Sequence, residues 1–333
     1  MENTVHMTLA AATALISEAL ETAGARAAVA RSVARALVAA EAEGQVGHGF
    51  SRVADYAAQL QSGKVNAGAE VRVEARGAAS LLIDAECGFA YPALDAAIEA
   101  GLPLADSAGV AVMAVGNSHH CGALSVQVDR IARAGFIAIM VANTPKAIAP
   151  WGAKDAVFGT NPIAFATPRV GDAPMVIDLS LSVVARGKVM NAARAGQPIP
   201  EGWALDAAGN ATTDAQAALA GTMVPIGEAK GTALALMVEL LAAAFTGSAF
   251  SSEATSFFAA EGAPPRVGQT LIALKPGGDY AERAEALLAS IADMPGARLP
   301  GARRLAALAR AEAEGLLVPQ RLYDGAVALA AGS

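Results

Sequence analysis

The sequence predicts an α/β fold in which a helical segment comes first and a sheet flanked by helices follows. Apolar residues recur at helical spacing from residue 8 to residue 43. From Pro92 onward, short runs rich in Val and Ile alternate with helical segments, which is the order of α/β proteins. In a chain of 333 residues, 54% hydrophobic and 17% charged residues indicate a large buried core and argue against disorder.

Spacing and turn residues predict the individual elements. Gly24 divides the first stretch into two antiparallel helices, and a third helix follows His48 and ends at Gly63. Alternating or continuous apolar runs predict strands at 71–74, 80–84, 110–115, 136–142, 175–179 and 270–274. Helical spacing predicts helices at 92–100, 122–134, 181–193 and 230–245, and two more that begin at Tyr280 and Arg303. Residues 191–225, rich in Gly, Pro, Asp and Thr, are expected to form long surface connections.

Composition favours a small-molecule ligand over nucleic acid or a membrane. The net charge is −7, whereas nucleic acids and anionic membranes require a basic protein surface. No basic leader precedes the first apolar residues, and the most apolar helical run, 232–245, is shorter than the roughly 20 residues that a bilayer requires. Cys87 and Cys121 provide neither a disulfide framework nor a paired-cysteine zinc motif. We therefore expect a cytoplasmic protein with reduced thiols.

One group of chemically active side chains lies at the start of the third helix. His48, Arg52 and Tyr56 are spaced i, i+4 and i+8, so a helix beginning here would present them on one face. The planar guanidinium of Arg52 suits a carboxylate, which points to a 2-oxo or 2-imino acid as the substrate. The alternative is a helix N-terminus with a solvated arginine and a half-buried tyrosine.

A second group follows the strand at 110–115, where the chain reads Asn-Ser-His-His-Cys-Gly. His120 and its neighbour His119 would lie beside the free amides of the next helix, where a phosphate or a developing oxyanion is stabilised. Histidine titrates near neutrality and can give a proton to a carbonyl oxygen. A core histidine is the alternative. A metal site is disfavoured because no carboxylate stands at ligand spacing, and Cys121 beside His120 is a weak nucleophile candidate.

Three further segments could contact a ribose or phosphates. They are the Gly-Thr-Asn-Pro turn that begins at Gly159, the strand end that carries Asp178, Ser180 and Ser182, and Lys230-Gly231 at the start of a helix. A cation at a helix start opposes the helix dipole, which a bound anion would explain. Ordinary turn residues, strand termination and a solvated lysine are the alternatives. The Rossmann fingerprint and the P-loop are both missing from the sequence, so a dinucleotide would have to bind in another way.

Taken together, these segments resemble the malate/L-lactate dehydrogenase family of the second, non-Rossmann type. That family also includes ureidoglycolate, sulfolactate and cyclic ketimine acid oxidoreductases. The resemblance runs nearly end to end. Its matching segments are GHGFSRVADY at 47–56, NSHHCGA at 117–123, ANTPKAIAPWGAKDAVFGTNPIAFATP at 142–168, VIDLSLSVVARGKV at 176–189, IPEGWALDAAGNATTD at 199–214, PIGEAKGTALALMVELL at 225–241 and MPGARLPGARR at 294–304.

The resemblance implies an NAD(P)-linked enzyme with a fold of its own, in which a mixed sheet is flanked by helices. It implies that His120 and His48 are catalytic and that Arg52 and Tyr56 bind the substrate. By the same resemblance the dinucleotide contacts Thr144, Asp178, Leu179, Ser180, Lys230 and Gly231, and we expect the turn residues Gly159, Thr160 and Asn161 to join them. No metal is expected. Gly47 departs from the family, which usually has Ser before this histidine, and so leaves the identity of the substrate open.

The family likeness also implies organisation. We expect residues 1–105, packed with 280–333, to form the N-terminal helical and substrate region, and residues 106–279 to form the cofactor-binding region. We also expect a homodimer with the active site near the subunit interface. A mean hydropathy of +0.41 supports this, because it suggests more apolar surface than one subunit hides.

The predicted reaction is hydride transfer between NAD or NADP and a small 2-oxo or 2-hydroxy acid of the malate, lactate or sulfolactate kind. Arg52 would hold the carboxylate, His120 would supply the proton, and His48 would polarise the same oxygen or orient the carboxylate. The alternative is a reductase of cyclic ketimine acids such as pyrroline- or piperideine-2-carboxylate. A minor alternative, based on Gly47, is an inactive ligand-binding relative.

Overall fold

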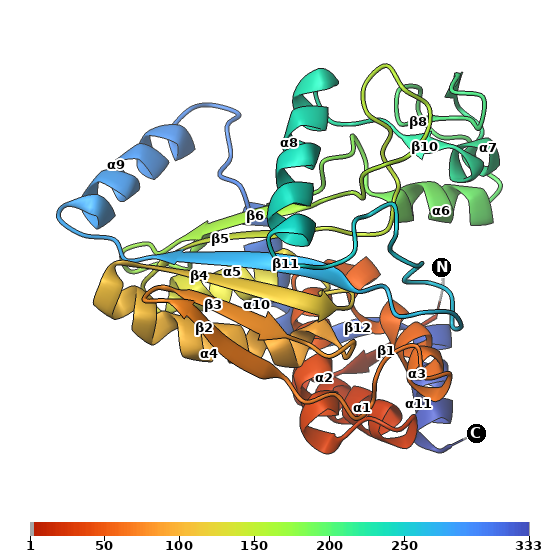
Figure 1. Ribbon diagram of the computed structural model, residues 1–333, viewed down its shortest axis with the longest axis horizontal. Helices are drawn as coiled ribbons and strands as arrows, with labels where there is room; N and C mark the ends of the chain where they lie inside the picture. The colour runs from red at the N-terminus through yellow and green to blue at the C-terminus, as the bar shows by residue number, and fades with distance from the viewer. Residues whose placement is uncertain (1–2, 333) are drawn as a thin grey trace.

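The computed structural model describes residues 3–332, and its centre is a seven-stranded sheet (Figure 1). Across the sheet the strands lie in the order β2 (Arg72–Gly77), β3 (Ser80–Asp84), β4 (Val110–Ser118), β11 (Val267–Leu274), β5 (Ile137–Ala142), β6 (Ile163–Thr167) and β7 (Met175–Leu179). Strands β3 and β4 pair in parallel, and the other neighbours are antiparallel. The predicted α/β fold with a mixed sheet is confirmed.

Helices α4 (Ala90–Ala108) and α5 (Leu124–Arg133) pack on one face of this sheet. Their buried side chains, among them Leu94 and Ile131, join Met113 of β4 in the main core. A Cβ atom at Gly101 would collide with Met113, so the glycine lets α4 lie close against β4. The packing fixes the carboxyl end of β4, from which the chain leads directly to the two histidines.

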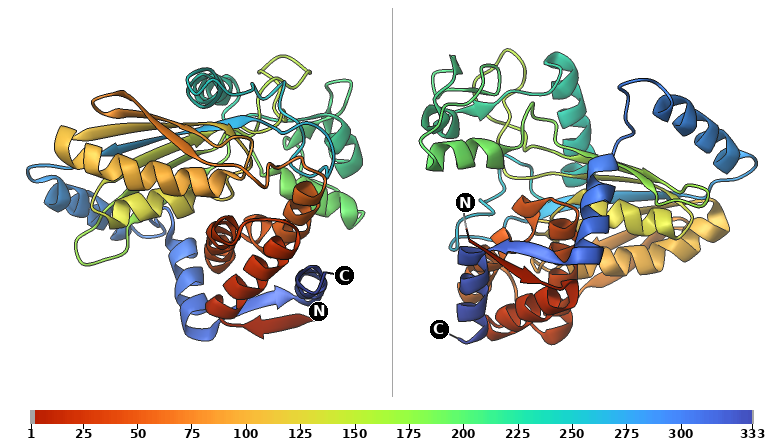
Figure 2. Two further views of the ribbon diagram at one scale, coloured as in Figure 1. Left: turned by 60° about the horizontal axis from the view of Figure 1, so that its bottom comes forward. Right: turned by 180° about the vertical axis from the view of Figure 1, so that it is seen from behind.

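A second layer combines the two ends of the chain (Figure 2). It contains α1 (Leu9–Thr22), α2 (Ala27–Ala42), α3 (Val53–Gln61), α10 (Ala302–Glu314) and α11 (Gln320–Ala330). Strand β1 (Thr4–Met7) pairs antiparallel with β12 (Leu316–Pro319), which ties the two ends together. The helices share one apolar core that includes Leu20, Leu37 and the fully buried Tyr56.

A third part of the molecule packs against the other face of the sheet (Figure 1). Its elements are α6 (Arg186–Arg194), β8 (Ala204–Leu205), β9 (Ala211–Thr212), α7 (Ala215–Ala220), β10 (Thr222–Met223), α8 (Ala229–Glu239) and the π-helical turn η3 (Leu240–Ala244). Leu181, Val238 and Phe158 belong to its separate core. Helix α9 (Tyr280–Ala292) projects from the body as an arm.

Two helix predictions differ from the structure at their starts. The third helix begins at Val53, because two 3-10 turns, η1 (Val46–His48) and η2 (Phe50–Arg52), precede it. A Cβ atom at Gly49 would collide with Glu41, whose carboxylate accepts the amide of Phe50 at 2.8 Å, and this bond bends the chain out of helical geometry. The one-face helical argument for His48, Arg52 and Tyr56 was therefore wrong in its premise.

The predicted helix at 181–193 begins only at Arg186, because backbone amides of residues before it bond to other segments of the chain. The amide of Leu181 donates to Thr160 O at 2.8 Å and that of Val183 to Val224 O at 2.9 Å. Residues 191–225 contain helix α7 and a three-stranded sheet in addition to connections. Strands β1, β6 and β12 and helix α11 had no counterpart among the sequence predictions. None of the helices within residues 3–332 is both long and apolar enough to cross a bilayer.

Candidate active site

His120 lies where three elements meet, just beyond the end of β4. Its Nδ1 atom is 2.6 Å from the hydroxyl of Tyr56 on α3, and that hydroxyl is 2.9 Å from the hydroxyl of Tyr91 in the first turn of α4. Both tyrosines are almost completely buried. The imidazole is therefore held from behind by a short chain of two phenols, and its orientation is fixed by the packing of two helices.

The Nε2 atom of His120 faces the other way. It makes no hydrogen bond within residues 3–332, and it is not completely buried. The ring of His48 stacks on the imidazole at 5.2 Å between centroids with an 18° interplanar angle, and Phe257 packs against it at 5.1 Å. His120 is thus shielded on its sides and open at Nε2, the geometry that a proton donor to a small ligand requires.

Burial keeps all three site histidines neutral at pH 7. Burial, followed by the positive charge of Arg52, lowers the pKa of His48 to about 4. Burial, then Lys64 and Arg52, lower the pKa of His119 to about 3. The pKa of His120 lies well below its usual value, through burial first and then through Arg52 and the other two imidazoles. If Tyr56 donates to Nδ1, neutral His120 carries its proton on Nε2.

Arg52 lies beside these rings with its side chain mostly covered. Its Nε donates to Gly47 O at 2.8 Å, Nη1 is 3.6 Å from a carboxylate oxygen of Asp55, and the guanidinium carbon lies 4.6 Å above the ring of Phe258. The aromatic face stabilises the cation in place, and the mostly covered surroundings strengthen its attraction for an incoming carboxylate.

The two adjacent histidines have different surroundings. His119 is 1% exposed and is enclosed by the rings of Tyr56, Phe89 and Phe257. Neither of its ring nitrogens has a hydrogen-bond partner among residues 3–332. His119 is therefore a core histidine, and His120 is the candidate for a functional role.

Tyr56 occupies a different place from the one that helical spacing suggested. Its side chain is 0% exposed and bonds the Nδ1 side of His120, whereas His48 and Arg52 are partly exposed. Its hydroxyl pKa is raised, above all by burial, so the phenol remains a neutral hydrogen-bonding group.

The other chemistry proposed around His120 finds less support. Burial, with a smaller contribution from Asp178, raises the pKa of the Cys121 thiol to about 12, so this sulfur stays protonated. At the start of helix α5 the amide of Ser125 already donates to the Asp178 carboxylate at 2.8 Å. One of the amides expected to stabilise an oxyanion there is thus satisfied by a side chain of the protein. Residues 3–332 contain no cluster of three potential metal ligands.

Asp178 lies near the end of β7, and its carboxylate accepts a hydrogen bond from the start of helix α5. Burial raises its pKa to about 6, and the hydrogen bond from Ser125 opposes this effect. The Ser125 hydroxyl bonds Glu43, which in turn pairs with Arg304 at 2.8 Å. Asp178 is therefore part of a buried network that fixes the start of α5.

The polar turns assigned to a dinucleotide gather at the ends of β5, β6 and β7. The Thr144 hydroxyl accepts the amide of Thr160 at 2.9 Å, and a Cβ atom at Gly159 would collide with Thr144. The hydroxyl groups of Ser180 and Ser182 lie 3.2 Å apart on the next strand end. Half-buried hydroxyls thus line one face, and the exposed side chain of Leu179 adjoins them.

Asn161 plays a supporting part in this turn. It is 0% exposed, adopts a positive φ of 37°, and donates to Glu239 at 2.8 Å and to Ala235 O at 3.1 Å. Glu239 also accepts the Ser251 hydroxyl at 2.7 Å. The amide of Asn161 fixes the turn to helix α8 and points away from the surface.

Lys230 lies exposed in the first turn of α8. Gly231 is required there, because a Cβ atom would collide with Ile226 O. The amides of Ala229 and Gly231 have no hydrogen-bond acceptor in the described part of the chain. An ammonium group beside unpaired amides at a helix start fits an anion such as a phosphate, so the residues present suit a dinucleotide.

Several residues around His120 were missed by sequence reasoning. Phe257 and Phe258 lie on the irregular segment before β11, more than 130 residues from the histidine, and Phe89 and Tyr91 lie at the start of α4. Aromatic residues make up only 5% of the chain, so the adjacent pair of phenylalanines in a Ser- and Ala-rich segment was an available signal.

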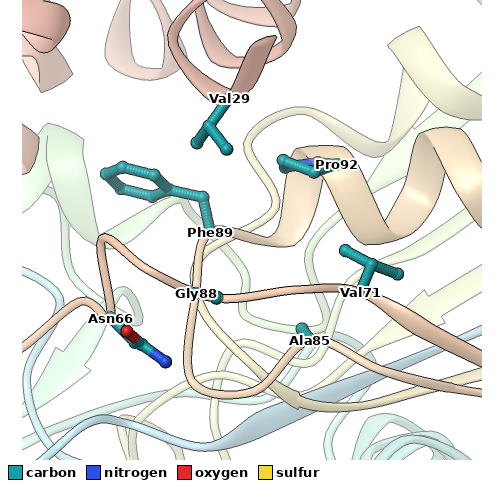
Figure 3. Close-up of a pocket in the computed structure, with 8 residues that line it drawn as sticks. Val29, Asn66, Val71, Ala85, Gly88, Phe89 and Pro92 are labelled. Atoms are coloured by element: carbon teal, nitrogen blue, oxygen red, sulfur yellow. The ribbon is translucent and has the colours of Figure 1, made fainter. Parts of the chain in front are cut away.

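A small cavity behind Phe89 is separate from this site (Figure 3). It has a volume of about 20 Å³, enough for about one water molecule. Its lining is mainly apolar and consists of Val29, Asn66, Ala69, Val71, Ala85, Gly88, Phe89 and Pro92. It does not hold a substrate.

Comparisons with known proteins point to one family. The family described as Malate/L-lactate dehydrogenase matches residues 7–325. The chain is 50% identical over 321 residues to the (2R)-3-sulfolactate dehydrogenase (NADP(+)) of Chromohalobacter salexigens, covering 96% of each protein. It is 42% identical over 307 residues to the Delta(1)-pyrroline-2-carboxylate/Delta(1)-piperideine-2-carboxylate reductase of Pseudomonas putida, covering 90% of this chain and 89% of the relative.

A solved structure extends the comparison to three dimensions. The crystal structure of delta1-piperideine-2-carboxylate reductase from Pseudomonas syringae pv. tomato superposes with a TM-score of 0.93 at 37% identity. The match covers 98% of this chain and 100% of that one.

Proposed function

Because the chain belongs to the malate/L-lactate dehydrogenase family, we propose that it is an NAD(P)-dependent oxidoreductase acting on a small 2-oxo or 2-hydroxy acid. The observation that carries the proposal is the arrangement of His120, with Nδ1 held by Tyr56 and Nε2 open beside Arg52. A carboxylate anchor and a proton donor are the two groups that reduction of a 2-oxo acid requires of a protein.

In this proposal the residues divide the work. Arg52 binds the carboxylate and brings the adjacent carbonyl carbon into position, with His48 beside it. His120, protonated once the bound carboxylate offsets the charge of Arg52, would give its Nε2 proton to the carbonyl oxygen as that oxygen becomes an alkoxide, and it would return to the neutral imidazole that Tyr56 holds at Nδ1. The carboxylate also offsets the charge of Arg52, which raises the proton affinity of His120 once the substrate is bound.

The cofactor would be held by residues from the other side of the site. Lys230 and the amides at the start of α8 suit its phosphates, and the hydroxyls of Thr144, Thr160 and Ser180 suit its ribose groups. When bound, the reduced nicotinamide supplies the hydride that this chemistry needs. Residues 1–105 with 280–333 would thus form the substrate side, and residues 106–279 the cofactor side.

A sulfolactate-type hydroxy acid is the first candidate substrate, supported by the relative with 50% identity. A cyclic ketimine acid is the second, supported by the Pseudomonas relatives and by the neutral state of the three imidazoles. A protonated imine brings its own proton, so hydride transfer to it needs no acid from the protein.

A homodimer in the cytoplasm completes the proposal. Helix α8 and turn η3 expose Leu236, Met237 and Leu240, each more than 40% exposed, and Phe245 follows at 51%. Such an apolar stripe on one subunit favours burial against a second copy. The free thiols Cys87 and Cys121 fit a reducing compartment.

Steady-state assays test the function. Purified protein is supplied with NADH or NADPH and a panel of oxaloacetate, pyruvate, sulfopyruvate and pyrroline-2-carboxylate, and oxidation of the cofactor is followed by absorbance. Highest kcat/KM on an oxo acid supports the first candidate, and highest kcat/KM on the cyclic imine supports the second. Cofactor binding without turnover of any panel member would indicate that the protein is an inactive ligand-binding relative.

A further inference from the structure

Lys64 is a buried cation without a carboxylate partner. It follows α3 and is 1% exposed. Its ammonium donates to Ser256 O at 2.6 Å and to Ala259 O at 2.9 Å. Among the described residues no carboxylate oxygen lies within 4 Å of it. Burial lowers its pKa, which shows that the site disfavours the charge.

Two neighbours of Lys64 bind the same segment. The Gln59 amide donates to Phe257 O at 2.9 Å and to Ala259 O at 3.0 Å, and the Ser62 hydroxyl donates to Ala260 O at 2.6 Å. Residues 256–260 form neither helix nor strand, so these carbonyls depend on side chains for their hydrogen bonds. We call Gln59, Ser62 and Lys64 the clamp.

The segment that the clamp holds bears the two rings that border the candidate site. Phe257 is 6% exposed and packs against His120, and Phe258 lies under Arg52. The two side chains therefore border both the proposed proton donor and the proposed carboxylate anchor. A shift of the segment would change the space between them.

We propose that Lys64 is a positioning residue that fixes segment 256–260 and so sets the substrate pocket between Phe257 and Phe258. The inference rests on the proposed function of the site. Hydrogen bonds from a charged donor are stronger than neutral ones, and this explains a buried cation at a place where an apolar side chain would cost less to bury. The aromatic pair then selects compact substrates, since a bulky group beside the carboxylate would displace a ring that the clamp holds in place.

The test compares Lys64→Met, which keeps the length but removes the donors, with Lys275→Met as a matched control. Lys275 lies on the surface and pairs with Asp106. Chymotrypsin cuts after phenylalanine, so limited digestion of the intact protein, with fragments weighed by mass spectrometry, reports release of Phe257 and Phe258. We expect cutting at these two residues to rise about tenfold in Lys64→Met, in line with the loss of one or two buried hydrogen bonds.

Kinetics provide the second readout. We expect KM for the carboxylate substrate to rise about tenfold in Lys64→Met, while kcat and the dissociation constant of the cofactor change little, because His120 and Lys230 are untouched. The control variant should match the wild type in both measurements. A purely structural role would lower the melting temperature without this split between KM and kcat.

Gln59→Met keeps the test decisive if Lys64→Met fails to fold, because it removes two of the bonds without removing a charge. Wild-type cutting at Phe257 and Phe258 in every folded clamp variant overturns the proposal, as does increased cutting with unchanged KM. If the wild-type protein turns over no panel substrate while cutting still rises in Lys64→Met, the proposed function fails and the clamp stands.

Discussion

Replacing Tyr56 by Phe tests how His120 is held. The change removes one oxygen atom, which is bonded to His120 Nδ1 at 2.6 Å and to the Tyr91 hydroxyl at 2.9 Å. Two buried polar atoms then lose a partner, at about 1–3 kcal/mol for each unsatisfied group. Because the void is small and the ring packing is retained, these two groups dominate the cost, and we expect the free energy of unfolding to fall by about 2–6 kcal/mol.

The effect on catalysis should be separate from the effect on stability. A positioned proton donor contributes about 10²- to 10⁴-fold to a rate, and Tyr56→Phe leaves the donor present but free to rotate or to place its proton on Nδ1. We therefore expect kcat on an oxo acid to fall by about 10- to 100-fold, with the cofactor dissociation constant unchanged. Denaturant unfolding measures the first effect, and absorbance of the reduced cofactor at saturating substrate measures the second.

Tyr91→Phe is the matched control. It removes a hydroxyl from the same chain of phenols but leaves the bond between Tyr56 and His120 intact. We expect a cost in stability of about 1 kcal/mol and little change in kcat. Equal losses of kcat in the two variants, or a Tyr56→Phe enzyme with wild-type kcat, would refute the claim that the phenol orients the proton donor.

Other perturbations follow from the same geometry. His120→Ala should lower kcat on an oxo acid by about 10²- to 10⁴-fold and leave cofactor affinity nearly intact; wild-type turnover in steady-state assays would remove His120 from the mechanism. Arg52→Lys should raise KM for the carboxylate by about tenfold or more, because a point charge does not reproduce the planar fork; unchanged kinetics would show that Arg52 does not bind the substrate. Gly47→Ser should fold normally, since no atom lies within 4 Å of the added Cβ, and a change in the ratio of kcat/KM between oxo acid and cyclic imine would show that this position selects the substrate. The three site histidines have pKa values below 6.5 in the folded protein, near 4 and 3 for two of them, so the unfolded chain binds more protons and stability should fall as the pH drops from 6.5 toward 3. Asp178, with a pKa raised to about 6, opposes this trend, as do Glu41 and Asp55, whose pKa values burial also raises; denaturant unfolding at several pH values checks the net sign.

Local patterns in the sequence were sufficient for much of the fold. The helices on either side of Gly24, the strand at 175–179 and the long helix that begins near Lys230 were predicted because each has an apolar period that its own residues supply. Helix α6 and the start of α3 were misplaced because distant groups determine them. The carbonyl groups of Thr160 and Val224 accept the amides of Leu181 and Val183, and the Glu41 carboxylate accepts the amide of Phe50.

The order of strands could not be read from any local pattern. Strand β11 lies between β4 and β5, although about 125 residues separate it from β5 in the chain. Its place is set by the antiparallel hydrogen bonds that it forms with both strands. The same insertion brings the segment before β11, with Phe257 and Phe258, against His120. Contacts between residues so far apart in the chain produce no periodic pattern in the sequence from which they could be predicted.

The sequence by itself determined the α/β class, most of the helices, and the residue types available for chemistry at residues 48–56 and 119–120. The surroundings of these groups depend on the tertiary structure. His119 entered an aromatic core, His120 kept Nε2 open, and Tyr56 went behind the imidazole. The physical reason is that residue type and spacing fix what a side chain can do, whereas burial and hydrogen-bond partners, which come from elements far apart in the chain, fix whether it is free to do it.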